Sequence, residues 1–292
     1  MPFTKSQIER LGRRLVEQTP PAEADLDDLA VLLNAYDEAL DAASDTLREL
    51  GSAPTGRLKN TGTILEKLRR HGGSWLKSIQ DLAGLRIVVE GGLADQDRVA
   101  GEILQRFADC PKPPKKIDRR ADPRQGYRAV HVIVFPDGMP VEVQIRTVPQ
   151  HMWAELFEKL ADLLGRGIRY GEDFEMPGER QIAQLRTIHP EPELDEDFVE
   201  IVGEISETKR LLRDLVKAFL DLSEQIGLDE ESLDNPEFEA THEDIRQELK
   251  RLFEGMRPLI DQLESFAVST RTSAHMLVTA VDADSAVGSD HD

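Results

Sequence analysis

The chain has 292 residues, of which 39% are hydrophobic and 5% aromatic, and its 56 Asp and Glu outnumber its 36 Lys and Arg to give a formal net charge of −20. This length and apolar content suffice for one or two domains with a packed core, which argues against a disordered chain. A single cysteine, Cys110, excludes an internal disulfide framework and a multi-cysteine zinc site.

The charge is distributed unevenly along the chain. Residues 57–170 contain 20 Lys and Arg against 14 Asp and Glu, whereas the remainder contains 16 against 42. A basic centre between acidic flanks is expected where an anionic ligand binds centrally. No apolar run approaches the roughly 18 residues that span a bilayer, and the N-terminus has no apolar signal-peptide core. We therefore expect no membrane partner and a cytoplasmic location.

The N-terminal part of the chain reads as helical. Leucines at helical spacing predict helices over residues 5–18 and 24–50, with Gly51 as the stop signal. The elements expected next are a loop containing Pro54 and Gly56, a short helix over 61–71, a buried strand over 84–90, a helix over 95–108 and a basic loop over 111–126. The loop assignment for 111–126 rests on its proline and its charge, which disfavour packing.

The clearest local signal is a β-hairpin. Residues 127–135 and 139–147 flank Asp137-Gly138, a strong two-residue turn. This turn would pair Ile133 with Glu142 and His131 with Gln144. Because side chains alternate between the faces of a sheet, one face would carry the polar set Tyr127, His131, Glu142, Gln144 and Arg146. The other face would be a core of Val130, Val132, Val134, Val141, Val143 and Ile145.

Further helices are expected downstream. Residues 151–164 form an amphipathic pattern, and two long helical patterns run from Phe198 to Ile226 and from Ile245 to Phe266. Asp234-Asn235-Pro236 separates the two long patterns, which predicts an acidic helical hairpin. The predicted domains are N-terminal helices at 1–50, a core at 51–175, the hairpin extension at 190–275 and a disordered tail at 280–292. Docking on the core, homo-oligomerisation and binding of a regulatory partner all remain open as roles of the extension.

The polar face of the hairpin is typical of phosphoryl-transfer sites. Such sites need hard oxygen ligands for Mg²⁺ and positive groups that neutralise phosphate charge. Glu142 is the inner carboxylate, and Asp81, just before the strand that contains Arg86, is the natural second ligand. The glycines do not have the spacing of a Walker-type phosphate loop.

Four segments together carry a resemblance to a known family. They are GRLKNTGTILEKL (56–68), IQDLAGLRIVV (79–89), RQGYRAVHVIV (124–134) and VEVQIRT followed by HMWAE (141–155). Their order and spacing resemble the RelA/SpoT synthetase domain over about residues 40–170. The resemblance implies an α+β fold, in which a mixed β-sheet of nucleotidyltransferase type is packed by helices. Because the hydrolase domain of the long bifunctional enzymes is missing, the chain resembles a small stand-alone alarmone synthetase.

The implied activity is that of a GTP/GDP diphosphokinase. Such an enzyme moves the pyrophosphate of ATP to the ribose 3′-hydroxyl of GDP or GTP, giving the stringent-response alarmones ppGpp and pppGpp together with AMP. Asp81 and Glu142 would be the catalytic pair and the Mg²⁺ ligands, with Glu142 also the candidate base. The residues that would bind ATP are Arg57, Lys59, Thr63, Lys67 and Arg86. The residues that would bind GDP or GTP are Tyr127, His131, Gln144, His151, Lys115, Lys116 and Arg124.

Some of these roles have a direct physical reason. Arg57 and Arg86 resemble a pair that sandwiches adenine, and planar guanidinium groups stack well on a flat base. Tyr127 resembles the residue that stacks on guanine. Gln125 departs from the small polar residue that usually precedes the Gly-Tyr pair, which puts the choice of acceptor in question.

Two other functions are kept open. One is a toxic relative that transfers the same pyrophosphate to the 3′ end of tRNA, a ligand that the acidic flanks would repel. The other is a catalytically silent module that binds nucleotides or partners. That module is disfavoured because Asp81, Glu142 and Tyr127 are all present.

Overall fold

The computed structural model of the chain describes residues 2–79, 81–174, 179 and 196–233, and the single positions 247, 251, 254, 258 and 261. The chain divides into two compact units. The sheet unit includes the residues up to Pro123 and Arg128–His151, and the helical unit includes Arg124–Tyr127 and Met152–Asp229. Of the second helix of the predicted hairpin extension only these five single positions are described, and each is helical. The predicted disordered tail lies outside the described residues, and the predicted domain limits stay predictions.

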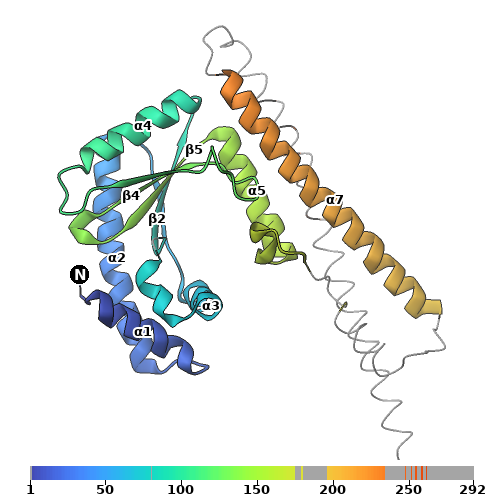
Figure 1. The fold of residues 1–292 in the computed structure, drawn as a ribbon, viewed down its shortest axis with the longest axis horizontal. Coiled ribbons are helices and arrows are strands. Elements are labelled where there is room, and N and C mark those ends of the chain that lie inside the picture. The colour runs from blue at the N-terminus through green and yellow to red at the C-terminus, as the bar shows by residue number, and fades with distance from the viewer. Residues whose placement is uncertain are drawn as a thin grey trace, which may run out of the picture. The chain divides into compact units, whose positions relative to one another are not determined.

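A five-stranded mixed sheet forms the centre of the sheet unit (Figure 1). Its strands are β1 (Thr55–Leu58), β2 (Ala83–Val89), β3 (Lys115–Asp118), β4 (Val130–Val134) and β5 (Val141–Thr147). They are ordered β1-β2-β5-β4-β3. Only β2 and β5 pair in parallel among these strands. The predicted α+β fold with a mixed sheet is therefore confirmed.

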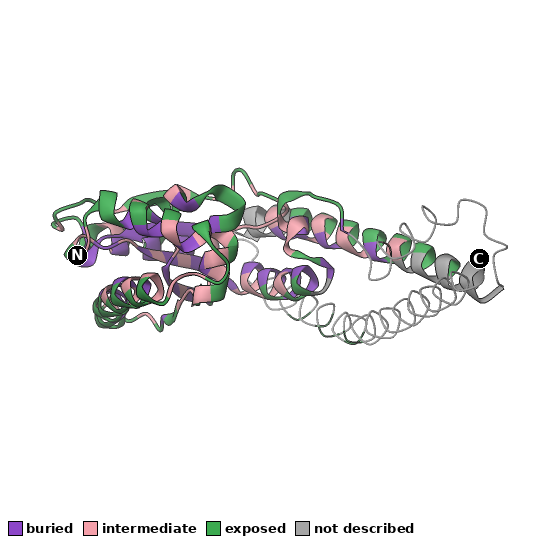
Figure 2. Cartoon of the chain, turned by 90° about the horizontal axis from the view of Figure 1, so that it is seen from below, coloured by how far each residue is buried: buried purple, intermediate pink, exposed green. Residues whose placement is uncertain are grey.

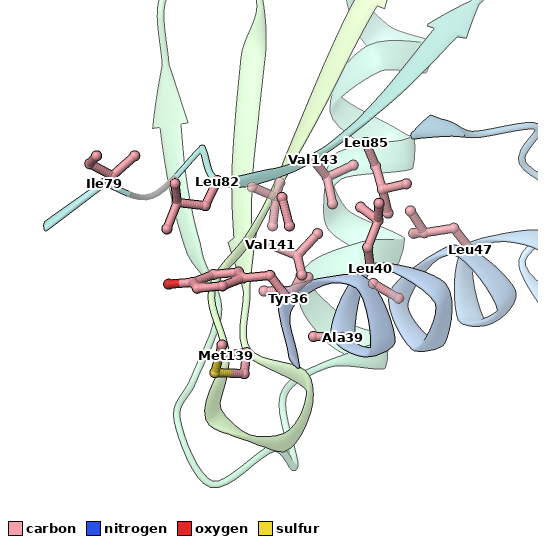
Figure 3. Close-up of a cluster of buried hydrophobic side chains, with 14 of the residues drawn as sticks. Tyr36, Ala39, Leu40, Leu47, Ile79, Leu82, Leu85, Met139, Val141 and Val143 are labelled. Atoms are coloured by element: carbon pink, nitrogen blue, oxygen red, sulfur yellow. The ribbon is translucent and has the colours of Figure 1, made fainter. Parts of the chain in front are cut away.

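Helices pack on one face of this sheet. The predicted N-terminal helices are present as α1 (Lys5–Glu17) and α2 (Glu23–Glu49), and α1 begins with a capping box between Thr4 and Gln7. The leucines of α2 meet the alternate residues of β2 and β5, as Leu40 does with Leu85 and Val143 in Figure 3. Helix α4 (Leu93–Arg106) adds Val99, Ala100 and Ile103 to the same core.

The hairpin register is confirmed. In the β4–β5 ladder His131 pairs with Gln144 and Ile133 with Glu142. Asp137 and Gly138 have φ angles of 49° and 78°, the positive values that a type I′ turn requires at both central positions. The valines predicted for the core face are all buried. Strand β4 begins at Val130, however, so the prediction that Tyr127 lies on this strand is wrong.

Two predicted loops contain strands. The loop around Pro54 and Gly56 includes β1, which pairs with β2, and the basic loop over 111–126 includes β3, which pairs with β4. Both strands are at sheet edges and mostly exposed. Edge strands are stabilised by one partner and tolerate charge, so they lack the apolar alternation that reveals an inner strand. A Cβ on Gly56 would lie 3.0 Å from Leu85 Cδ2, which explains the glycine in β1.

The helices predicted over 61–71 and 151–164 are present, and two short 3₁₀ helices that were not predicted follow them. Helix α3 (Thr61–His71) is followed by the 3₁₀ helix η1 (Gly73–Ser78), which leads toward Asp81. Helix α5 (Val148–Leu164) starts directly after β5, and η3 (Arg166–Tyr170) follows it.

The helical unit has its own core. The first long helical pattern is present as α7 (Glu196–Leu233). One side of α7 is buried through Leu212, Phe219 and Ile226, while the intervening charged residues are exposed (Figure 2). Trp153 of α5 stacks on Phe157 with ring centroids 4.7 Å apart and donates a hydrogen bond from Nε1 to the Phe219 carbonyl at 2.8 Å. Among the described helices none is long and apolar enough to cross a membrane.

Candidate active site

The strand register brings several of the predicted residues to the face of the sheet opposite α2 and α4. Directly paired residues of neighbouring strands point to the same side. One row across the sheet contains Arg57, Gly84, Glu142, Ile133 and Lys115, and the next contains Thr55, Arg86, Gln144, His131 and Ile117. Gly84 has no side chain, so the row is open between Arg57 and Glu142. The two arginines predicted to hold adenine lie on adjacent strands and share this face.

Glu142 is held in a nearly closed hydrogen-bonding environment. His131 Nδ1 lies 3.1 Å from Oε1, and Gln144 Nε2 donates to Oε2 at 2.8 Å. Only 12% of the Glu142 side chain is exposed. Burial by itself would raise the pKa of Glu142, but the hydrogen bonds from His131 and Gln144 hold that pKa below its ordinary value. The carboxylate is therefore charged at neutral pH and fixed in orientation.

Arg146 continues this network one step further along β5. Its guanidinium donates to Gln144 Oε1 at 2.9 Å, and its side chain is almost fully buried. Because arginine can only donate, Gln144 must turn its oxygen toward Arg146 and its amide nitrogen toward Glu142. The alternation in VEVQIR could have indicated this role, since residues 142, 144 and 146 share a face.

Asp81 is paired with two lysines that were predicted to bind ATP phosphates. Lys59 Nζ donates to Oδ2 at 2.6 Å, and Lys67 Nζ, from α3, donates to Oδ1 at 2.9 Å. Burial alone would raise the pKa of Asp81, but Lys59 and Lys67 hold it below its usual range. The same burial lowers the pKa of the Lys59 ammonium, and the nearby Asp81 opposes this effect. The sequence did not indicate this pairing, because Asp81 lies 22 and 14 residues along the chain from Lys59 and Lys67.

Asp81 and Glu142 are close enough to interact electrostatically, since the charge of Asp81 acts to raise the pKa of Glu142. The residues that the structure describes contain no group of three or more acidic, His or Cys side chains suited to a metal ion. Mg²⁺ is commonly held by one or two carboxylates, with water and substrate phosphates completing its octahedron. Two carboxylates beside two lysines fit a metal that arrives with a nucleotide, and Mg²⁺ stays a prediction.

Thr63 lies at the start of α3, where Asn60 caps the helix. The Asn60 carboxamide oxygen accepts hydrogen bonds from the Thr63 amide and hydroxyl, both at 2.8 Å. One turn along the helix, Lys67 reaches Asp81. The short segment from Lys59 to Lys67 therefore presents both lysines and a helix N-terminus, a combination suited to phosphate groups.

The predicted acceptor residues are not all brought together. His131 and Gln144 contact Glu142, and Lys115 is exposed at the edge of the same row. Lys116 lies on the opposite face, where its ammonium pairs with Asp97 of α4 at 2.7 Å. Adjacent strand residues point to opposite sides, so Lys116 faces away from Glu142, and its role in binding GDP or GTP stays a prediction.

The remaining acceptor residues lie beyond the sheet. His151 is in the first turn of α5 and is half-buried. Arg124 and Tyr127 belong to the helical unit, where they form the ends of a tight turn. Sequence reasoning missed this turn because Gln125, which has a positive φ of 48°, is not a typical turn residue.

Comparison with known proteins identifies relatives for this part of the chain. Residues 56–161 match the family described as "Region found in RelA / SpoT proteins". An uncharacterised protein of Mycobacterium tuberculosis strain H37Rv is 39% identical over 178 residues, which are 59% of this chain and 63% of that protein. The match thus spans less than two thirds of that relative. A GTP pyrophosphokinase of Streptomyces antibioticus is 33% identical over 110 residues, or 37% of this chain and 13% of that enzyme.

Similarity is also found to solved structures. Small alarmone synthetase 1 from Bacillus subtilis is 27% identical, with 62% of this chain and 99% of that chain covered and a TM-score of 0.40. The same synthetase bound to its product pppGpp is 26% identical, with 61% and 98% covered and a TM-score of 0.40.

Proposed function

We propose that this chain, whose residues 56–161 match the RelA/SpoT family, is a pyrophosphokinase that converts ATP and GDP or GTP to AMP and ppGpp or pppGpp. The observation that carries the proposal is the pairing of Asp81 with Lys59 and Lys67 beside the buried, ionised Glu142. Two positive and two negative side chains close together suit a polyphosphate and its metal.

In the proposed reaction one covalent bond forms and one breaks. The ribose 3′-oxygen of the acceptor bonds to the β-phosphorus of ATP, the bond from that phosphorus to the α,β-bridging oxygen breaks, and AMP leaves. The proton of the hydroxyl goes to a base or to solvent. Lys59 and Lys67 would hold the phosphates of ATP, and Arg57 and Arg86 would stack on its adenine. A bound Mg²⁺ supplies charge neutralisation for the phosphates.

Glu142 is better suited to orienting the acceptor than to strong proton abstraction. Its lowered pKa makes it a weak base at neutral pH, because an efficient base has a pKa near the working pH. Its fixed carboxylate can accept a hydrogen bond from the 3′-hydroxyl and contribute an oxygen ligand to the metal. His131 and Gln144 keep the carboxylate in that orientation.

The experiment is a transfer assay with purified full-length chain, Mg²⁺ and ATP labelled in the β,γ-pyrophosphoryl group. GDP, GTP and deacylated tRNA are supplied in separate reactions. Label on the guanine mononucleotide, with AMP in equal amount, supports the proposal. Label only on tRNA would replace it with the tRNA-modifying reaction, and no label on any acceptor would reject it in favour of a silent binding module.

The role of Glu142 is tested by the variant Glu142→Gln, which keeps the size of the side chain and removes its charge. We expect transfer to fall at least roughly a hundred-fold, as for loss of a group that acts in the transition state. ATP binding, measured by calorimetry, should change little, because the predicted ATP contacts lie on other residues. A variant with most of the wild-type rate would remove Glu142 from the mechanism.

A further inference from the structure

The turn that carries Tyr127 has an unusual backbone. Gln125 and Gly126 have φ angles of 48° and 76°, and the Tyr127 amide donates to the Arg124 carbonyl at 3.1 Å. The chain therefore reverses within four residues, and Tyr127 emerges at the end of the reversal. The direction of its side chain depends on how firmly this turn is held.

Helix α7 and helix α5 hold the turn by its backbone. The Ser223 hydroxyl, on α7, donates a hydrogen bond to the Gly126 carbonyl. A Cβ built on Gly126 would lie 2.9 Å from Ser223 Cβ and 2.9 Å from the Trp153 ring, so the turn is packed without room for a methyl group. Ser223 is only 2% exposed. The Gly126 backbone is therefore closely packed against α7 and α5.

Further contacts fix the same arrangement. The Trp153 indole donates to the carbonyl of Phe219, one helical turn before Ser223, so α5 and α7 are tied together next to the turn. Tyr127 packs against the core of the helical unit to which both residues belong. A Cβ on Gly171 would lie 2.8 Å from Gln125 Nε2, so the long Gln125 side chain also reaches the end of η3.

We infer that Ser223 of α7 and Trp153 of α5 are positioning residues for Tyr127, which makes α7 part of the acceptor-binding apparatus. The inference rests on the proposed function and on the role that the family resemblance predicts for Tyr127, which is to stack on the guanine of GDP or GTP. The predicted ATP residues Arg57, Lys59 and Lys67 all belong to the sheet unit. A disturbance of the contact between α7 and the turn should consequently weaken binding of GDP or GTP and leave ATP binding unchanged.

The test compares Ser223→Ala, which removes the hydroxyl, with Ser223→Val, which also pushes methyl groups into the Gly126 backbone. Steady-state kinetics are measured with either nucleotide varied. For Ser223→Ala we expect KM for the guanine nucleotide to rise roughly three- to ten-fold, the range for loss of one hydrogen bond. Ser223→Val should raise it further, and KM for ATP should stay within about two-fold. The control is Glu224→Ala, which alters the exposed neighbour on the same helix.

A second measurement does not depend on catalysis. Amide hydrogen exchange of residues 125–127 in the nucleotide-free protein should accelerate in Ser223→Val and not in Glu224→Ala, because the valine loosens the turn. Unchanged exchange and an unchanged acceptor KM in a folded Ser223→Val protein would overturn the inference. If Ser223→Val does not fold, Ser223→Ala decides by the same two readouts. A wild-type protein with no transfer activity would reject the proposed function alone, and the exchange result would still decide whether α7 holds the turn.

Discussion

At the scale of single residues, the centre of the site is internally neutralised before any nucleotide binds. Asp81 accepts from both Lys59 and Lys67, so these side chains compensate one another's charge. In the proposed reaction, binding of ATP with its metal would require an exchange, in which the lysines turn to phosphate oxygens and the carboxylate turns to the metal. The paired arrangement keeps three charged groups in place in a partly buried position without a ligand.

This exchange leads to a prediction for Asp81→Asn. Without the carboxylate, both lysines are available to ATP and no negative charge opposes the phosphates. In EDTA, we therefore expect the Kd for metal-free ATP to fall roughly three- to ten-fold, equivalent to about 0.6–1.4 kcal/mol. Transfer with Mg²⁺ should be strongly reduced. Isothermal calorimetry measures the Kd.

The matched control for this prediction is Glu66→Gln, which removes a negative charge from α3 where it pairs with Arg70. It should leave the metal-free Kd nearly unchanged, because the exposed pair is well screened. Equal or weaker ATP binding by Asp81→Asn would show that the two lysines do not contact the phosphates.

At the scale of elements, α1 supports the segment that leads to Asp81. Gly12 of α1 and Gly73 of η1 are in direct backbone contact, and a Cβ on Gly12 would lie 2.7 Å from Leu76 Cβ. The ion pair between Glu9 and Lys77 joins the same two elements. The close approach explains why a glycine occurs inside a helix, where it costs conformational entropy.

The prediction at this scale is that Gly12→Ala destabilises the fold by about 1–3 kcal/mol through overpacking. Gly101→Ala is the matched control, since Gly101 is inside α4 and a Cβ there would have nothing within 4 Å. Alanine at Gly101 should stabilise the fold by up to about 1 kcal/mol, from helix propensity alone. Urea unfolding gives both values. Stabilisation of both variants to the same extent would show that α1 and η1 do not pack as closely as described.

The same scale shows how much of the fold the sequence could predict. The β4–β5 hairpin was predictable because Asp137-Gly138 favours one turn type and alternate valines allow one register. Strands β1 and β3 were not, because pairing with β2 and β4 stabilises short edge segments that have little apolar content. Long-range contacts of this kind leave no local pattern.

The candidate site was likewise predictable only in part from the sequence. Glu142, Gln144 and His131 followed from strand alternation, and their hydrogen bonds agree with it. The face on which Lys116 lies was not predictable, because a loop assignment carries no information about sheet faces. The contact of Ser223 with Gly126 joins residues nearly a hundred positions apart, and its only sequence signal is a glycine that many other turns would also explain.

At the scale of the whole molecule, pH acts on stability in two opposing ways. The formal net charge of −20 produces self-repulsion at neutral pH, which weakens as the pH falls toward the pI near 4.8. Acid also protonates carboxylates that the fold holds in the charged form. The pKa values of Asp81 and Glu142 are both lowered, chiefly by their partners against the effect of burial.

The sign of the second effect follows from linkage. A carboxyl group with a lowered pKa in the folded state contributes stability that is complete above its ordinary pKa and is lost as the pH falls through the folded-state value. We therefore expect stability to pass through a maximum between neutral pH and the pI, and to decline once the pH falls below about 4, where unpaired Asp and Glu already bind protons. Urea unfolding over the range from pH 7 to pH 3 measures this profile.

The variant Glu142→Gln separates the contribution of Glu142 to the pH dependence of stability. The variant turns an amide donor toward the Gln144 amide, or loses the His131 bond, so it should be less stable than the wild type at pH 7. The difference should shrink below pH 4, because protonation of Glu142 removes the same charge from the wild type. Glu224→Gln, at an exposed position, should differ little from the wild type throughout. A gap between wild type and Glu142→Gln that stays constant down to pH 3 would mean that the buried carboxylate is not held in its charged form.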